Sequence, residues 1–422
     1  MTQPSQLDVF HGEQLVGHVY DTAPLSFAYS TYWLQRPEPM AVAAIPLASD
    51  RQDLEAVQAF FENLLPEGEL RTYIAEQNKA STLFSLLKLA GDTASGFVIL
   101  PAGQTPQAPS YEATTWAKLG ATLKGKSAAA IDIKSKGARI SLAGAQDKAS
   151  IAIFADGIPM LPKGTSPSTH ILKPDIRRLA KVWESAANET LIMRTAALCG
   201  LPTADVFYQP DTHACIVKRF DRIALVDNSL GRLIQYDMCQ LSATQSEKKY
   251  EKEGGPGIAE CAMLIRKYSS QPAVDLRNFV NWIFFNLYVG NNDSHAKNLS
   301  IYRLPDKRVM LTPFYDLMCT RIYPGLSQEF AFAVGGEVMP GNITRQHIEG
   351  MARQLGMRPA FVFKSAKDLA DKLPAAIDQA IDVLKPDMTR NAQTFIVRLQ
   401  RFVISTMKKT VTRISEQEKK IS

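Results

Sequence analysis

The sequence lacks several features that would place it outside the soluble proteins. No apolar run approaches the roughly 20 residues that a membrane-spanning helix requires. The beginning, MTQPSQLDVFHGEQ, has neither the basic nor the apolar region of a secretory signal. The five cysteines form no CxxC pair, and the six histidines show no HExxH or other zinc-ligand spacing. These absences argue against a zinc enzyme and predict a soluble protein of the reducing cytoplasm without membrane contact.

The composition is that of a large globular protein. Hydrophobic residues make up 45% and charged residues 21% of the 422 positions, and the chain has no internal repeat or low-complexity tract. A chain of this length exceeds one ordinary core, so two or three packed units are expected. The net charge of +6 permits contact with nucleic acid or an acidic protein but does not by itself indicate either.

Residues 1–105 are predicted to form a small α+β subdomain. Strand-like runs at 15–20 and 97–100 alternate with amphipathic stretches at 54–65 and 81–89. The following segment, PAGQTPQAPS at 101–110, carries three prolines and few apolar side chains, which is typical of a linker. We therefore place a boundary near residue 105.

Two further units are predicted after the linker. Residues 106–240 contain short β-type runs around one helical stretch at 182–199. The β-type runs lie at 149–154, 169–173, 214–220 and 232–235. Residues 241–422 are predicted to be mainly helical, with only helices and loops in the last hundred residues. One helix has the apolar spacing of a buried face, formed by Leu276, Phe279, Val280, Ile283 and Leu287.

A set of polar residues follows this helix. The helix is expected to end at Gly290, and Asp293 then precedes Asn298 with four residues between them, the spacing of a kinase catalytic loop. Two β-type runs at 299–304 and 309–314 follow, and Asp316 lies just beyond the second. The order is therefore helix, loop, hairpin and second aspartate.

Phosphoryl transfer needs these residue types in this order. One carboxylate must accept the proton of the attacking hydroxyl, which we assign to Asp293, and an amide with a second carboxylate must hold Mg²⁺, which we assign to Asn298 and Asp316. The alternative is that Asn-Asn-Asp-Ser is only a polar turn. The position of Asp316 after a hairpin favours the kinase interpretation.

Two upstream elements fit the same chemistry. Lys173 ends a β-type run before a helix, where a lysine could pair with nucleotide phosphates. Glu189 or Glu184 could orient it, and we prefer Glu189. The small residues Ala143, Gly144 and Ala145 lie between two β-type runs, where backbone N–H groups could approach phosphate oxygens.

A second stretch matches a phosphate-binding pattern by letter. Residues 120–127, GATLKGKS, fit the Walker A pattern, which functions only between a buried strand and a helix. The residues before it are polar and helix-like. We therefore reject this stretch as a phosphate loop.

Several segments together resemble the HipA family of bacterial serine/threonine kinases, which act as toxins of type II toxin–antitoxin pairs. They occur in family order and extend over both lobes expected for the family. The matching segments are FFENLLPEG (60–68), ISLAGAQDK (140–148), HILKPD (170–175), KRFDR (218–222), YDMCQ (236–240), GGPGIA (254–259), NNDSHAKNLSIY (291–302) and LTPFYD (311–316). The resemblance implies an α+β, protein-kinase-like two-lobed fold with an extra N-terminal subdomain and an all-helical C-terminal lobe.

The resemblance also implies functional residues. ATP would be bound with Mg²⁺, and Ser141 would be an autophosphorylation site whose modification silences the kinase. The residues that the resemblance places around the nucleotide are Ala143, Gly144, Ala145, Gln146, Asp147, Lys148, Lys173, Tyr236, Asp237, Met238, His295, Ala296, Lys297, Asn298, Tyr315 and Asp316.

The implied partners are a protein substrate, such as an aminoacyl-tRNA synthetase, and a small helix-turn-helix antitoxin. Operator DNA would be contacted only within the antitoxin complex. Two alternatives stay open: a catalytically idle kinase fold that binds an antitoxin or DNA, and a small-molecule kinase of the same fold. The joint presence of Asp293, Asn298, Asp316 and Lys173 favours an active kinase, because a binding module has no physical need for all four.

Overall fold

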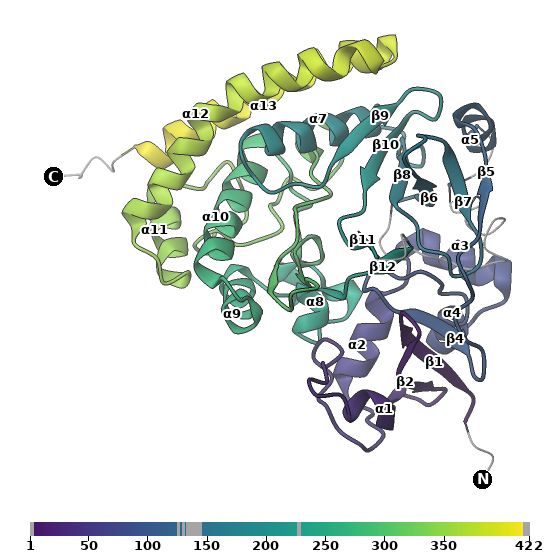
Figure 1. Ribbon diagram of the computed structural model, residues 1–422. Helices are drawn as coiled ribbons and strands as arrows, with labels where there is room; N and C mark the ends of the chain where they lie inside the picture. The colour runs from purple at the N-terminus through teal and green to yellow at the C-terminus, as the bar shows by residue number, and fades with distance from the viewer. Residues whose placement is uncertain (1–3, 125–126, 129–130, 132–145, 226–228, 417–422) are drawn as a thin grey trace. The chain divides into compact units, whose positions relative to one another are not determined.

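The computed structural model describes residues 4–124, 127–128, 131, 146–225 and 229–416, and Figure 1 shows their helices and strands. The chain divides into two compact units, and each unit is built from three separate stretches of the sequence. Unit 1 comprises Met1–Pro174, Val217–Glu247 and Tyr302–Lys307, and unit 2 comprises Asp175–Ile216, Lys248–Ile301 and Arg308–Ser422. The boundaries near residues 105 and 240 stay predictions.

Unit 1 begins with a four-stranded antiparallel sheet of strand order β3-β2-β1-β4. Gly12 makes the turn between β1 and β2 in the left-handed conformation, with φ 59°, which glycine adopts without steric cost. The strands are β1 Gln6–His11, β2 Gln14–Tyr20, β3 Ser26–Tyr29 and β4 Val98–Pro101. The strand predictions at 15–20 and 97–100 are confirmed by β2 and β4.

Four short helices lie between β3 and β4 in the chain. They are α1 Thr31–Leu34, α2 Glu55–Asn63, α3 Gly68–Asn78 and α4 Leu83–Leu87. Of these, α1 and α2 pack against this sheet. The ring of Phe61 on α2 lies 5.8 Å from that of Phe27 on β3, and both side chains are fully buried. Aromatic burial of this kind supplies much of the core energy of a small unit.

The second part of unit 1 contains the strands β5, β7, β6 and β8, adjacent in that order. They are β5 Tyr111–Ala113, β6 Ala149–Ile153, β7 Pro159–Pro162 and β8 His170–Pro174. Helix α5, Trp116–Leu123, follows β5 and is capped by the hydroxyl of Thr115. Residues 104–110 before β5 have no secondary structure, as the proline-rich composition predicted.

The remaining elements of unit 1 are short: β11 Arg222–Ala224, β12 Leu230–Arg232, β13 Gln235–Asp237 and α8 Met238–Leu241. Strands β11 and β12 form an antiparallel pair. Helix α8 begins with a capping box in which Asp237 accepts a hydrogen bond from the Gln240 backbone N–H and the Gln240 side chain accepts one from the Asp237 N–H. The capping box fixes the point at which the chain turns from β13 into α8.

A buried ionic cluster holds unit 1 together. Asp92 is fully buried; its Oδ1 accepts hydrogen bonds from Arg222 at 2.6 Å and from Arg232 at 2.7 Å. Asp221 accepts two hydrogen bonds from Arg219, at 2.9 and 2.7 Å, and one from Arg222 at 2.7 Å. Burial raises the pKa of Asp221, but the guanidiniums of Arg219 and Arg222 outweigh it and hold that pKa below its ordinary value.

Unit 2 is mainly helical. Its helices are α7 Ser185–Leu198, α9 Ile258–Tyr268, α10 Pro272–Val289, α11 Arg345–Gln354, α12 Pro359–Leu384 and α13 Arg390–Ser415. Figure 1 shows the long helices α12 and α13, in yellow-green, beside α7 and α10, and α10 packs against both α12 and α13. The predicted apolar face of α10 is confirmed, since Leu276, Phe279, Val280, Ile283 and Leu287 are all buried.

Unit 2 also contains the short strands β9 Val206–Gln209 and β15 Val309–Leu311. Strands β10, Ala214–Lys218, and β14, Ser300–Arg303, each begin in unit 2 and end in unit 1. Beyond residue 322, the described residues form helices and loops apart from one isolated bridge between Val334 and Glu337, as predicted. None of the described helices combines the length and apolar character needed to span a lipid bilayer.

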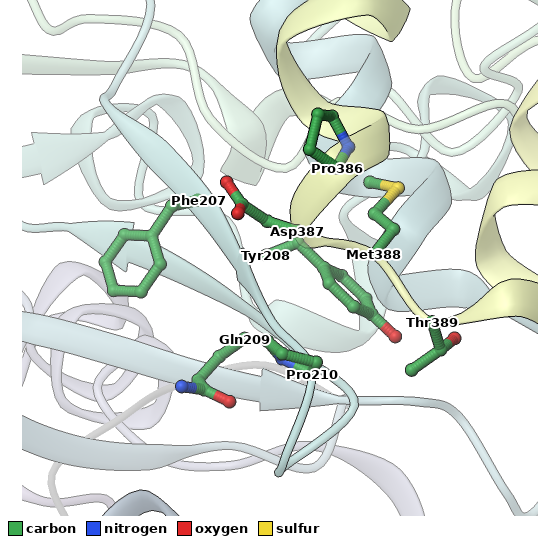
Figure 2. A pocket seen from close by; sticks show the side chains of 8 residues that line it. All are labelled: Phe207, Tyr208, Gln209, Pro210, Pro386, Asp387, Met388 and Thr389. Carbon is green, nitrogen blue, oxygen red and sulfur yellow. The ribbon is translucent and has the colours of Figure 1, made fainter.

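Unit 2 also has an open pocket of about 570 Å³ between β9 and the junction of α12 and α13. Figure 2 shows the Tyr208 ring reaching toward Thr389 and the Phe207 ring pointing away, as expected for neighbours on a strand. Burial raises the pKa of Tyr208 to about 12, so its hydroxyl stays neutral. The lining residues are Phe207, Tyr208, Gln209, Pro210, Pro386, Asp387, Met388 and Thr389, and none is a predicted site residue.

Candidate functional site

Helix α10 ends where the candidate catalytic loop begins. Gly290 caps the helix in the left-handed conformation with φ 73°, and its N–H donates to the carbonyl of Asn286. The Gly290 carbonyl in turn accepts a hydrogen bond of 3.0 Å from the backbone N–H of Arg321. The start of the loop is thus fixed to the helix on one side and to residues 320–322 on the other.

Three buried asparagines hold the loop. Asn286 on α10 accepts a hydrogen bond of 2.8 Å from the Asn291 side chain, and Asn291 Oδ1 accepts one of 3.2 Å from the backbone N–H of Asp293. Asn292 donates its backbone N–H to the Thr320 hydroxyl at 2.8 Å. A satisfied, buried amide network makes this backbone rigid.

The predicted base and the predicted metal ligand are joined by a hydrogen bond. Asn298 Nδ2 donates to the backbone carbonyl of Asp293 at 3.0 Å, and the backbone N–H of Asn298 donates to the carbonyl of His295 at 2.9 Å. Asn298 is 6% exposed, whereas the side chain of Asp293 is 56% exposed. The loop therefore presents one carboxylate to solvent from an otherwise buried frame.

Two aromatic side chains lie beside this carboxylate. The hydroxyl of Tyr250 donates to Asp293 Oδ1, and His295 Nε2 lies 4.0 Å from the same oxygen. The rings of Tyr250 and His295 meet edge to face, with centroids 5.2 Å apart. Tyr250 lies 43 residues before Asp293 and outside the kinase-like motif, so the sequence alone does not predict this contact.

The hairpin of β14 and β15 leads to the second aspartate. Tyr315 donates its hydroxyl to the carbonyl of Lys297 at 2.9 Å and lies 2.7 Å from the hydroxyl of Ser300. Asp316 follows in the left-handed conformation with φ 60°, which is uncommon for a residue other than glycine. Such backbone strain is concentrated at functional sites.

The donor set near Asp293 is compatible with Mg²⁺. Because Nδ2 of Asn298 donates to the Asp293 carbonyl, its Oδ1 is the atom left for a cation. Asp316, the second predicted ligand, follows the β14–β15 hairpin in the chain. Hard oxygen donors of this kind suit Mg²⁺, which is usually held by one or two protein ligands together with substrate phosphates. Among the described residues, no group of three or more His, Cys, Asp or Glu side chains could hold a metal ion without such help.

The sequence matches known proteins over most of its length. The HipA N-terminal domain matches residues 7–100, and the HipA-like C-terminal domain matches residues 140–380. The Sinorhizobium fredii protein Y4mE is 32% identical over 370 residues, which cover 85% of this chain and 87% of that protein. The chain belongs to the HipA family.

Other members of the HipA family support this relationship. The serine/threonine-protein kinase toxin HipA of Shewanella oneidensis is 28% identical over 402 residues, which cover 90% of each chain. The solved structure of the complex of HipA, HipB and operator DNA from that organism contains a chain that matches with a TM-score of 0.82 and 23% identity, covering 96% of this chain and 97% of that one. The α+β, kinase-like fold predicted from the sequence is confirmed by this match.

The nucleotide residues expected from the HipA family are only partly described in unit 1. Ser141, Ala143, Gly144 and Ala145 lie outside the described residues. Asp147 follows them and accepts hydrogen bonds from the hydroxyl of Ser127 and, at 2.7 Å, from the backbone N–H of Ala128. Its neighbours Gln146 and Lys148 are described and half-buried. The Asp147 carboxylate therefore has a structural role in this HipA-family chain.

The strand lysine and the predicted hinge both lie in unit 1. Lys173 lies on β8 and is only 6% exposed. The side chain of Tyr236 is buried against Phe60 and Phe97, and its hydroxyl donates to the carbonyl of Ala41 at 3.1 Å. Asp237 caps α8, and Met238 is fully buried, so contacts of this HipA-family hinge with a nucleotide would come mainly from backbone groups.

Two further sequence interpretations can be compared with the structure. Gly120 lies within α5, so the Walker-like stretch does not start a loop after a strand, in agreement with its rejection. Glu189 is fully enclosed on α7, whereas Glu184 is half-buried at the N-cap of the same helix. Burial, and secondarily the charge of Asp175, raises the pKa of Glu184 to about 7.

Proposed function

We propose that this HipA-family chain is an ATP-dependent serine/threonine protein kinase in which Asp293 is the catalytic base. The observation that carries the proposal is the exposed Asp293 carboxylate on a loop whose backbone is fixed by buried asparagines. A base must be accessible to the acceptor and held in one position. The name of the Shewanella relative, a serine/threonine-protein kinase toxin, supports the same activity.

The proposed reaction transfers the γ-phosphoryl group of ATP to a serine or threonine hydroxyl. Asp293 accepts the hydroxyl proton as the new oxygen–phosphorus bond forms and the bond from phosphorus to the bridging oxygen of ADP breaks. Mg²⁺, when bound, neutralises charge on the phosphates, and Asn298 Oδ1 and the Asp316 carboxylate would hold it. The hydrogen bond from the Asn298 side-chain amide to the Asp293 carbonyl would keep the base and the metal ligand at a fixed separation.

We assign ATP binding to the residues predicted above. Lys173 would pair with phosphate oxygens, as expected of a strand lysine in a kinase. The other residues assigned to ATP binding are 143–148, the backbone of 236–238, 295–298, 315 and 316. These nucleotide contacts, and the cytoplasm as the compartment, are predictions that variants and localisation experiments can test.

The regulation and partners are proposed from the family. Autophosphorylation of Ser141 would add about two negative charges close to the proposed phosphate loop and would weaken ATP binding by repulsion. The Shewanella HipA structure contains HipB and operator DNA. We propose that this chain likewise binds a HipB-like helix-turn-helix antitoxin, contacts operator DNA within that complex, and phosphorylates a protein substrate such as an aminoacyl-tRNA synthetase.

A direct assay tests the activity. Purified wild-type chain with MgATP should phosphorylate itself or a protein in a lysate, and mass spectrometry should place a self-phosphate on Ser141. Asp293→Asn should lower transfer by about 10²- to 10⁴-fold, because it removes the proton acceptor, while leaving MgATP binding nearly unchanged.

Asp316→Asn is the complementary variant. It should weaken Mg²⁺-dependent ATP binding, because it replaces an anionic oxygen ligand, and calorimetric titration would measure the change. Equal transfer by wild type and Asp293→Asn would refute the catalytic assignment. Absence of transfer by the wild type, with antitoxin binding intact, would favour a catalytically idle binding module.

A further inference from the structure

We infer that Tyr250 is a positioning residue for Asp293, and this inference rests on the proposed kinase function. The Tyr250 hydroxyl donates to Asp293 Oδ1, and His295 Nε2 faces the same oxygen at 4.0 Å. Among the described residues, Asp293 Oδ2 receives no hydrogen bond. The carboxylate is therefore held by one oxygen, and the other is left for the acceptor hydroxyl.

The Tyr250 ring is itself held in place. It meets the His295 ring at an interplanar angle of 88°, and His295 is a buried residue of the catalytic loop. This edge-to-face contact orients the phenol so that its hydroxyl reaches Oδ1. The ring contact and the hydroxyl contact are separable, because phenylalanine can keep the first and must lose the second.

A tight turn after Tyr250 sets the direction of the side chain. The Tyr250 carbonyl accepts hydrogen bonds from the backbone N–H groups of Glu253 at 2.9 Å and Gly255 at 3.0 Å. Gly254 has φ 92°, and a Cβ added at Gly255 would lie only 2.1 Å from the carbonyl oxygen of Lys248. The turn therefore needs a glycine at each of these two positions.

The turn is also anchored to a distant segment of unit 2. The carboxylate of Glu251 accepts a hydrogen bond of 2.7 Å from the backbone N–H of Ala333. A Cβ added at Gly257 would lie 2.6 Å from Glu251 Oε1, so Gly257 leaves room for this carboxylate. The glycine turn and the hydrogen bond between Glu251 and Ala333 together hold Tyr250 beside the base before any acceptor arrives. Catalytic geometry requires this kind of preorganisation.

The role predicts a specific kinetic defect. Without the phenol hydroxyl, the exposed Asp293 side chain can rotate about its side-chain torsions, and Oδ2 spends less time in the direction needed for proton transfer. Misplacement of a catalytic group by about 1 Å can cost about 10²-fold in rate. The loss should fall on the transfer step and spare ATP binding.

The test uses the full-length, dephosphorylated chain and radiolabelled MgATP in a self-phosphorylation assay. Tyr250→Phe should lower the maximal rate by about tenfold or more, with the half-saturating ATP concentration within about twofold of wild type. Gly255→Ala, which leaves Tyr250 intact but displaces its turn, should show the same kind of defect. Tyr268→Phe and Gly341→Ala are matched controls, the latter with open space around its Cβ, and both should behave as wild type.

The outcomes separate this inference from the proposed function. A Tyr250→Phe rate equal to wild type would show that only the ring matters, and a faster rate would show that the hydroxyl blocks the acceptor; either overturns the positioning role. A rise in half-saturating ATP that accounts for the whole defect would overturn it as well. An inactive wild type, or an Asp293→Asn variant as fast as wild type, would overturn the proposed function itself and the positioning role with it.

Discussion

Asp92 in unit 1 and Asp293 in unit 2 are both held by several hydrogen bonds, but at different parts of the residue. At Asp92 the carboxylate itself is bonded to arginines and is fully buried. At Asp293 the backbone N–H and carbonyl are bonded, one carboxylate oxygen accepts a hydrogen bond from Tyr250, and the side chain is 56% exposed. A buried, paired carboxylate stabilises a fold, whereas an exposed carboxylate on a fixed backbone can react with another molecule.

The largest expected effect is the loss of stability on substitution of Asp92. Asp92→Asn removes the carboxylate that pairs with Arg232 and one of the two that pair with Arg222, and breaking a buried ion pair costs about 3–5 kcal/mol. Urea unfolding should therefore show a much lower free energy of unfolding. Asp50→Asn changes an exposed aspartate of the same unit and should leave that free energy unchanged. Similar stability of the two variants would contradict the structural role of Asp92.

A medium effect is expected where the Asp293 backbone is held. Asn291→Ala removes the hydrogen bonds to Asn286 and to the Asp293 N–H inside a buried loop, at a cost of about 1–3 kcal/mol. Transfer activity should fall by about tenfold or more, because the base loses its fixed position. Thermal unfolding and the self-phosphorylation assay would measure both changes.

Asn391→Ala is the matched control, since Asn391 is exposed at the start of α13. It should keep the stability and the activity of the wild type. If Asn291→Ala were destabilised but as active as wild type, a fixed backbone would not be the property that separates Asp293 from Asp92.

The smallest expected effect is a pH-dependent change in stability at Glu184, a half-buried carboxyl group that is neither paired like Asp92 nor exposed like Asp293. Burial and Asp175 raise its pKa to about 7, and its Oε2 has no hydrogen-bond partner among the described residues. Ionisation of Glu184 lowers the free energy of unfolding, because the carboxylate is less stable in the folded chain than in the unfolded one. This loss of stability is absent below pH 4.5, the ordinary pKa, increases as the pH rises to about 7, and is constant at higher pH.

Glu184→Gln should therefore raise the free energy of unfolding at pH 8 by less than about 1 kcal/mol, because the group is half-exposed and screened. At pH 4 the variant and the wild type should be alike. Thermal unfolding at both pH values would measure the difference, and an equal gain at pH 4 and pH 8 would exclude ionisation as the cause.

The five cysteines show which properties the composition predicts and which it does not. The absence of a CxxC pair predicted a reducing environment, and all five cysteines are buried and free. Burial raises the pKa of Cys199 and of Cys319 to about 12, so these thiols are neutral near pH 7. The sequence could not show their burial, because burial depends on how distant segments of the chain pack together.

The sequence by itself determined the local order of the candidate catalytic region. The α10 helix, the Gly290 cap, the loop with Asp293 and Asn298, and the hairpin before Asp316 are consecutive, so periodicity and turn chemistry were enough to predict them. The polar helix α3 was missed, since GELRTYIAEQN has little apolar periodicity.

Only the tertiary structure decided which distant side chains meet. Tyr250 reaches Asp293 across 43 residues, and Asp92 reaches Arg222 across 130. The tertiary structure also directed the Tyr236 side chain into the core of unit 1, where its hydroxyl donates to the carbonyl of Ala41. Such pairings follow from the packing of whole elements, which leaves no periodic or spacing pattern in the sequence, and a single sequence therefore predicts the frame of this site but not the contacts that position its base.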